Sequence, residues 1–152
     1  MKEVKIFIET SLCGPCSPRE GWYGVMVEVE TSKGPATVGE IGMEEETTWN
    51  RSTLLAAVKG LKRLKPGYKV IIVTYSTFFK NTVERGNPES WQRSEWKNSS
   101  GEDVKHKELW QEYLELAAGH EIEVRFRKHF ECREELQKKI AEKREAKCRE
   151  SP

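Results

Sequence analysis

One acidic residue stands at the end of an apolar segment near the start of the chain. Residues 5–11 read Lys-Ile-Phe-Ile-Glu-Thr-Ser, and a loop rich in Cys, Gly and Pro follows them. An ionised carboxylate at the end of a buried strand loses hydration free energy unless it is paired, solvated or bound to a cation. Glu9 is therefore the first candidate for a functional residue.

Cysteine and histidine residues form a second set with chemical potential. Two residues separate Cys13 from Cys16, and two residues separate His129 from Cys132. Such short spacings occur between paired zinc ligands, so a structural zinc held by these four residues is one alternative. The alternative that we favour is free loop thiols with Cys132 in the core. The sequence Cys-Gly-Pro-Cys matches the thioredoxin active site, but no helical pattern follows it to lower a thiol pKa, so redox catalysis is not expected.

A short segment in the second half of the chain combines aromatic and basic residues. Trp91, Arg93, Trp96 and Lys97 lie within seven positions, a mixture suited to contact with the sugars and phosphates of nucleic acid. The alternative is that the two tryptophans pack under a loop while the charges are solvated.

Length and composition limit the class of protein. A chain of 152 residues fits one domain, and a net charge of +1 excludes a uniformly basic surface, so nucleic-acid binding would need a local patch. No segment approaches the ~20 apolar residues of a membrane span, so we expect no membrane partner and a cytoplasmic location. The predicted domain covers residues 1–141, and residues 142–152 form a charged helix extension or a frayed tail.

The hydrophobic pattern predicts the element order βββαβααβα. Expected strands cover residues 4–9, 22–30, 36–43, 68–75 and 121–127, and expected helices cover residues 49–65, 76–85, 103–119 and a segment from residue 131. Right-handed crossover rules place the first and fourth strands side by side in parallel. Residues 44–46, three glutamates, are expected to form a solvated acidic turn.

This order and several local sequences resemble type 1 ribonuclease H over nearly the whole chain. Residues 9–11 are similar to the family's Asp-Gly-Ser strand end, and residues 21–24 to its Gly-Tyr-Gly. Residues 49–57 resemble its helix start Asn-Asn-Arg-x-Glu-Leu-x-Ala-Ala, and residues 75–76 its Asp-Ser. Residues 91–97 and 109–111 resemble its Trp/Lys-rich segment and its Leu-Trp-Gln. The resemblance implies an α/β ribonuclease H-like fold, whose five-stranded mixed sheet has the order 3-2-1-4-5 and is flanked by helices.

The resemblance also implies where catalytic residues would lie. Enzymes of this family hold two divalent cations, Mg²⁺ or Mn²⁺, with four acids. Those acids fall on Glu9, Thr53, Tyr75 and Glu134, although alignment on Cys132 places Arg133 at the last position. Thr53 and Tyr75 are neutral and are expected to hydrogen-bond each other, whereas Glu9 and Glu134 would form a weak metal site. His129 stands where the family has a flexible-loop histidine.

The function expected from these substitutions is binding without standard two-metal cleavage. In this interpretation Asn50 and Arg51, at the helix start, join Trp91, Arg93, Trp96 and Lys97 in binding an RNA/DNA hybrid or another duplex. One alternative is an active RNA/DNA-hybrid ribonuclease with an altered metal site. Another alternative is a protein-interaction scaffold, in which zinc could stabilise the fold.

Overall fold

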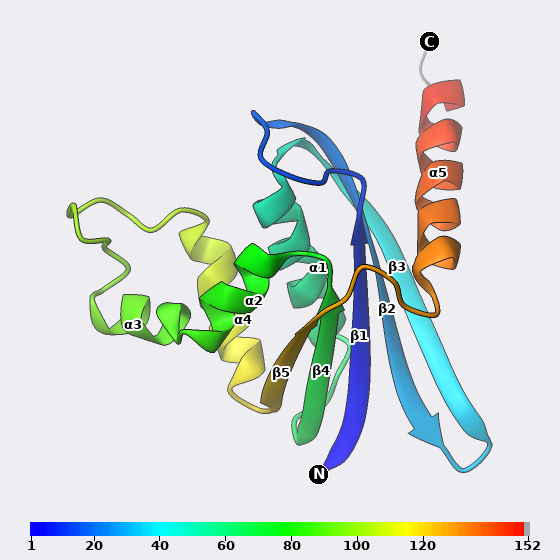
Figure 1. Ribbon diagram of the computed structural model, residues 1–152, viewed down its shortest axis with the longest axis horizontal. Helices are drawn as coiled ribbons and strands as arrows, with labels where there is room; N and C mark the ends of the chain where they lie inside the picture. Colours follow the sequence, from blue (N-terminus) through cyan, green and yellow to red (C-terminus); the bar gives the residue numbers. More distant parts are fainter. Residues whose placement is uncertain (151–152) are drawn as a thin grey trace.

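A five-stranded mixed sheet forms the centre of the computed structural model, which describes residues 1–150 (Figure 1). The strand order β3-β2-β1-β4-β5 confirms the predicted order. The strands are β1 (Lys2–Thr10), β2 (Arg19–Thr31), β3 (Gly34–Thr47), β4 (Tyr68–Thr74) and β5 (Glu121–Phe126). β1 pairs antiparallel with β2 and parallel with β4, as predicted.

Helices cover both faces of this sheet (Figure 1). They are α1 (Trp49–Leu61), α2 (Thr77–Glu84), α3 (Asn87–Arg93), α4 (Lys107–Ala117) and α5 (Arg133–Glu150). α1 packs against β1 and β2 on one face, and α5 packs against β1, β2 and β3 on the other. None of the described helices is both long enough and apolar enough to cross a membrane.

Side-chain alternation along β1 divides the core into two clusters. Ile6 and Ile8 belong to the larger cluster, which α1 covers, whereas Phe7 packs in the cluster that contains Leu136 of α5. This division follows from the two-residue period of a strand. The backbone of α1 comes so close to the sheet that a Cβ on Gly60 would lie 2.9 Å from Cγ2 of Ile6.

The segment between β4 and β5 departs from the prediction. No helix was expected between residues 85 and 103, but α3 begins at Asn87, because Pro88 has a fixed φ that suits a first helical turn. The next helix was expected to begin at residue 103. Instead α4 begins at Lys107 after His106, and the carboxylate of Asp103 pairs with Lys97 at 2.6 Å.

The acidic segment and the chain end differ from the prediction in different ways. Residues 44–46 lie in β3 rather than in a solvated turn, because this strand continues to Thr47 along β2. α5 continues past residue 141 to Glu150, so the division of the chain at residue 141 stays a prediction. Residues 151–152 of the predicted tail lie outside the described residues.

Candidate active site

Glu9 lies at the end of β1 with its carboxylate almost fully buried. Only 7% of the residue is exposed, and its Oε1 accepts a hydrogen bond from the backbone N–H of Thr10 at 3.0 Å. The other oxygen, Oε2, accepts from Nε of Arg133 at 2.7 Å. The guanidinium therefore neutralises the buried carboxylate, as expected for a charge that folding removes from water.

Arg133 is positioned by three contacts at the start of α5. Besides the bond to Glu9, its Nη1 donates to the backbone carbonyl of Lys128. Its guanidinium carbon lies over the ring of Tyr75, 5.6 Å from the centroid. This cation–π contact adds attraction between the guanidinium and the negative face of the phenol ring.

Tyr75 follows β4, the parallel neighbour of β1, and so stands at the same edge of the sheet as Glu9. Its ring stacks on Phe126 at a centroid distance of 5.5 Å and lies 6.1 Å from the ring of Trp49. Aromatic packing and Arg133 thus hold the phenol in place.

The remaining two family positions contribute no carboxylate to this group. Thr53 is 1% exposed, and its Oγ1 has no hydrogen-bond partner within the described residues. The predicted hydrogen bond between Thr53 and Tyr75 is therefore wrong. Glu134 is exposed in the first turn of α5, and the partner of Glu9 is Arg133 instead.

These residues do not fit a pair of divalent cations. Hard cations of this kind take several oxygen ligands, and the four family positions supply one buried carboxylate that a guanidinium already pairs. Among residues 1–150, no group of three or more His, Cys, Asp and Glu side chains could hold a metal ion. Glu9 is paired with Arg133 and Glu134 is exposed, so the weak metal site of Glu9 and Glu134 stays a prediction that this pairing does not favour.

Within residues 1–150 the predicted zinc site does not form. Cys13 and Cys16 lie in the loop between β1 and β2, whereas His129 and Cys132 lie between β5 and α5, and the four residues form no ligand cluster in the described part of the chain. Cys132 instead packs against the cluster that contains Phe7. Burial raises the pKa of its thiol to about 11, which favours the neutral form over the thiolate that zinc requires.

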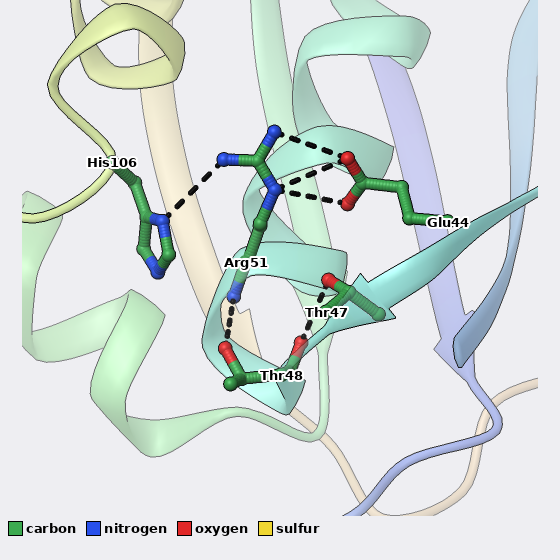
Figure 2. Close-up of polar contacts among 5 residues, drawn as sticks. All are labelled: Glu44, Thr47, Thr48, Arg51 and His106. Carbon is green, nitrogen blue, oxygen red and sulfur yellow. Dashed lines mark hydrogen bonds and ion pairs between the residues drawn. The ribbon is translucent and has the colours of Figure 1, made fainter. Parts of the chain in front are cut away.

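Arg51 is held in a second group of polar contacts beside the start of α1 (Figure 2). Its Nε lies 3.1 Å from both carboxylate oxygens of Glu44, and its Nη2 lies 3.0 Å from Oε2. Thr48, the N-cap of α1, accepts a hydrogen bond from the backbone N–H of Arg51 at 3.3 Å. Glu44 therefore pairs the charge of Arg51, which was predicted to bind nucleic acid.

His106 completes this group from the start of α4. Its Nδ1 lies 3.4 Å from Nη1 of Arg51, so the guanidinium donates and the imidazole accepts (Figure 2). Burial, followed by the charges of Arg51 and Lys105, lowers the pKa of His106 below its ordinary value. The sequence offered no signal for this residue, because its partner lies 55 positions away.

An open groove borders this group on the side of α2. Two adjoining hollows of about 330 and about 230 Å³ share Asn50, Phe78 and Lys105 in their walls. Phe78 is 52% exposed, which is unusual for a large apolar side chain. Asn50 was predicted from the sequence but Phe78 and Lys105 were not, since an aromatic residue in a short helix does not reveal whether it faces the core.

The aromatic and basic segment is divided between the core and the surface. Trp96 is buried in the larger core cluster, so the packing alternative describes this side chain. Trp91 is partly buried and contacts Trp110 edge to face at 5.7 Å, and it also lines the smaller hollow. Arg93 is exposed, and Lys97 pairs with Asp103. The four residues therefore do not form one surface.

Comparison with known proteins identifies the class of this fold and then the family. Among solved structures, LC9-RNase H1, a type 1 RNase H with the type 2 active-site motif, superposes with a TM-score of 0.67 at 24% identity, over 82% of this chain and 62% of that chain. The family model for RNase H matches residues 1–131. The chain belongs to the RNase H family.

Relatives named ribonuclease H share about a third of their residues with this chain. The protein from Caldicellulosiruptor saccharolyticus is 38% identical over 125 residues, which is 80% of each chain. The protein from Syntrophomonas wolfei is 34% identical over 125 residues, 82% of each chain. These relationships contradict the expectation of a domain that binds nucleic acid without cleaving it, and they support the alternative of an active ribonuclease.

Proposed function

We propose that this chain is a ribonuclease that acts on RNA/DNA hybrids through an active site altered from the type 1 pattern. The observation that carries the proposal is the 38% identity over 125 residues to a protein named ribonuclease H. The family model extends from β1, which contains Glu9, through β5. The match therefore includes both the strand ends of the candidate site and the groove beside it.

The chain's own residues suit recognition of a hybrid. The amide of Asn50 can hydrogen-bond sugars and base edges in the minor groove, and the exposed ring of Phe78 can stack on a sugar or a base. Lys105, exposed on the wall shared by both hollows, supplies positive charge for a phosphate. This local patch is consistent with a net charge of only +1.

At the strand ends, Glu9 and Arg133 form an ion pair. Glu9 can accept a proton or orient a hydroxyl group, and Arg133 can stabilise negative charge on a phosphate. Because the ligand set does not fit two cations, we assign roles only to these side chains. A cytoplasmic location stays a prediction from the sequence.

The test is cleavage of a hybrid labelled on its RNA strand, in Mg²⁺, in Mn²⁺ and in EDTA. We expect cleavage of the hybrid but not of single-stranded RNA or duplex DNA. Glu9→Gln should lower the rate roughly 10²–10⁴-fold, the range for loss of an acid–base group. Lys33→Gln, in the turn between β2 and β3 at the far end of the sheet, is the matched surface control and should cleave normally. Absence of hybrid cleavage by the wild-type chain under all three conditions would contradict the proposal.

A further inference from the structure

The guanidinium of Arg133 lies between a buried carboxylate and the solvent. The side chain of Glu9 is 8% exposed, whereas that of Arg133 is 23% exposed. The bonds of Arg133 use Nε and Nη1, and within the described residues its Nη2 makes no hydrogen bond. One edge of this cation is therefore available at the strand ends.

We propose that Arg133 takes the place of a metal ion at Glu9 and binds a backbone phosphate of the nucleic acid. The guanidinium would pair with the carboxylate through Nε and present Nη2 to a non-bridging phosphate oxygen. The identity of the phosphate rests on the proposed function, whereas the pairing of Arg133 with Glu9 does not.

The charges at the site support this exchange. Two divalent cations require several carboxylates, but the positions of Thr53 and Tyr75 are neutral, and Glu9 with Arg133 sums to zero formal charge. A carboxylate that is already neutralised attracts a divalent cation weakly. The same loss of acids removes the repulsion that a phosphate would otherwise meet.

The chemistry of arginine fits both contacts. A guanidinium stays protonated at all accessible pH values and has five N–H donors in one plane, so it can bind a carboxylate on one edge and a phosphate on another. The ring of Tyr75 under its face and the carbonyl of Lys128 at Nη1 keep this plane in one orientation. A lysine in its place would supply charge without this geometry.

The first arm of the test measures Mn²⁺ binding by isothermal titration calorimetry and by electron paramagnetic resonance, without nucleic acid. Wild type and Glu9→Gln should give the same titration, because Glu9 is not a ligand. If Glu9→Gln weakens Mn²⁺ binding roughly 10-fold or more, a loss at least as large as for removing a hydrogen-bond partner of a metal ligand, the pairing proposal is wrong.

The second arm measures binding of an RNA/DNA hybrid in EDTA as a function of salt, with strand integrity checked on a gel. Arg133→Gln should reduce the slope of log K against log [salt] by about 1, as expected for one lost phosphate contact. Lys33→Gln, which removes the same charge far from the site, should leave the slope unchanged. An unchanged slope in Arg133→Gln would overturn the phosphate contact.

Two further measurements keep these outcomes separate. Arg133→Gln leaves Glu9 buried without its partner, which destabilises the fold. The double variant Glu9→Gln/Arg133→Gln removes both charges and provides a folded comparison. Thermal unfolding is recorded for each variant. If the wild-type chain binds no hybrid, both the proposed function and the phosphate contact fail. The Mn²⁺ titration then still decides whether Arg133 or a metal ion pairs with Glu9.

Discussion

Arg51 and Arg133 each pair with a glutamate, but the two pairs leave different groups available. Arg51 is bound by Glu44 on one side and by His106 on the other, so each of its three guanidinium nitrogens has a partner within the protein. Arg133 pairs with a more deeply buried carboxylate and keeps Nη2 free within the described residues. The first pair therefore joins α1, β3 and α4, whereas the second leaves one guanidinium nitrogen without a hydrogen bond inside the described part of the protein.

At this residue scale, the lowered pKa of His106 predicts a pH dependence of stability. The neutral imidazole accepts from Arg51 in the folded state, whereas the unfolded chain has an ordinary pKa near 6.5. Between the two pKa values the unfolded state binds more protons, so the free energy of unfolding falls as the pH drops below about 6.5. Above that pH the contribution of His106 is fully present.

Urea denaturation of wild type and His106→Gln between pH 5 and pH 7.5 measures this effect. The glutamine variant should lose less stability than wild type on acidification, since it has no imidazole to protonate. Taking the difference between the two proteins cancels the carboxylates that titrate in both. Parallel pH profiles for the two proteins would show that His106 does not contribute.

At the scale of elements, α5 determines where Arg133 stands. The helix is highly charged and touches the sheet through a narrow apolar stripe in which Leu136 is 1% and Ile140 is 5% exposed. Both side chains lie next to Gly24 of β2, where a Cβ would come within 3.2–3.3 Å of them. The absence of a side chain at Gly24 therefore allows α5 to approach the strand that pairs with β1.

Truncating a side chain in the apolar stripe of α5 should destabilise the protein and also loosen the position of Arg133 in the candidate active site. Leu136→Ala should lower the free energy of unfolding by roughly 2–5 kcal/mol, the range for truncating a buried leucine. Lys138→Ala, on the exposed side of the same helix, should change it by less than about 0.5 kcal/mol. Chemical denaturation measures both values, and equal losses in the two variants would show that α5 does not depend on its apolar stripe.

At the scale of the whole molecule, the sheet order places the candidate active site at the ends of two strands that are each paired on both sides. β1 and β4 each pair with a strand on both sides, whereas β3 and β5 lie at the edges of the sheet. Glu9 and Tyr75 stand at the ends of these two central strands. A rigid centre with the reacting groups at its end holds them in place while loops and helices contact a large ligand.

Hydrogen exchange followed by mass spectrometry tests this distribution of stability. Amides in β1 and β4 should exchange at rates close to those set by global unfolding, because opening them breaks ladders on both sides. Amides in the outer part of β3 and in β5 should exchange faster through local opening. Protection of β5 equal to that of β1 would contradict a stability gradient across the sheet.

The order of the strands, the parallel pairing of the first and fourth strands and the place of Glu9 were determined by the sequence alone. These features depend on patterns that a short window contains, such as alternation in residues 25–30, the helical spacing in residues 54–64 and the apolar run at residues 70–73. Crossover handedness then limits the topology. The helix α3 was not predicted, because Gly, Asn and Pro occur in turns as well as at helix starts.

The partners of the charged side chains were decided only by the tertiary structure. Glu9 and Arg133 lie 124 positions apart, Arg51 meets His106 across 55, and Trp96 enters the core rather than a binding surface. No local sequence window contains both members of such a pair. Which arginine neutralises which carboxylate depends on how α1, α4 and α5 dock on the sheet, because the desolvation of a charge and the distance to its partner exist only in the folded chain.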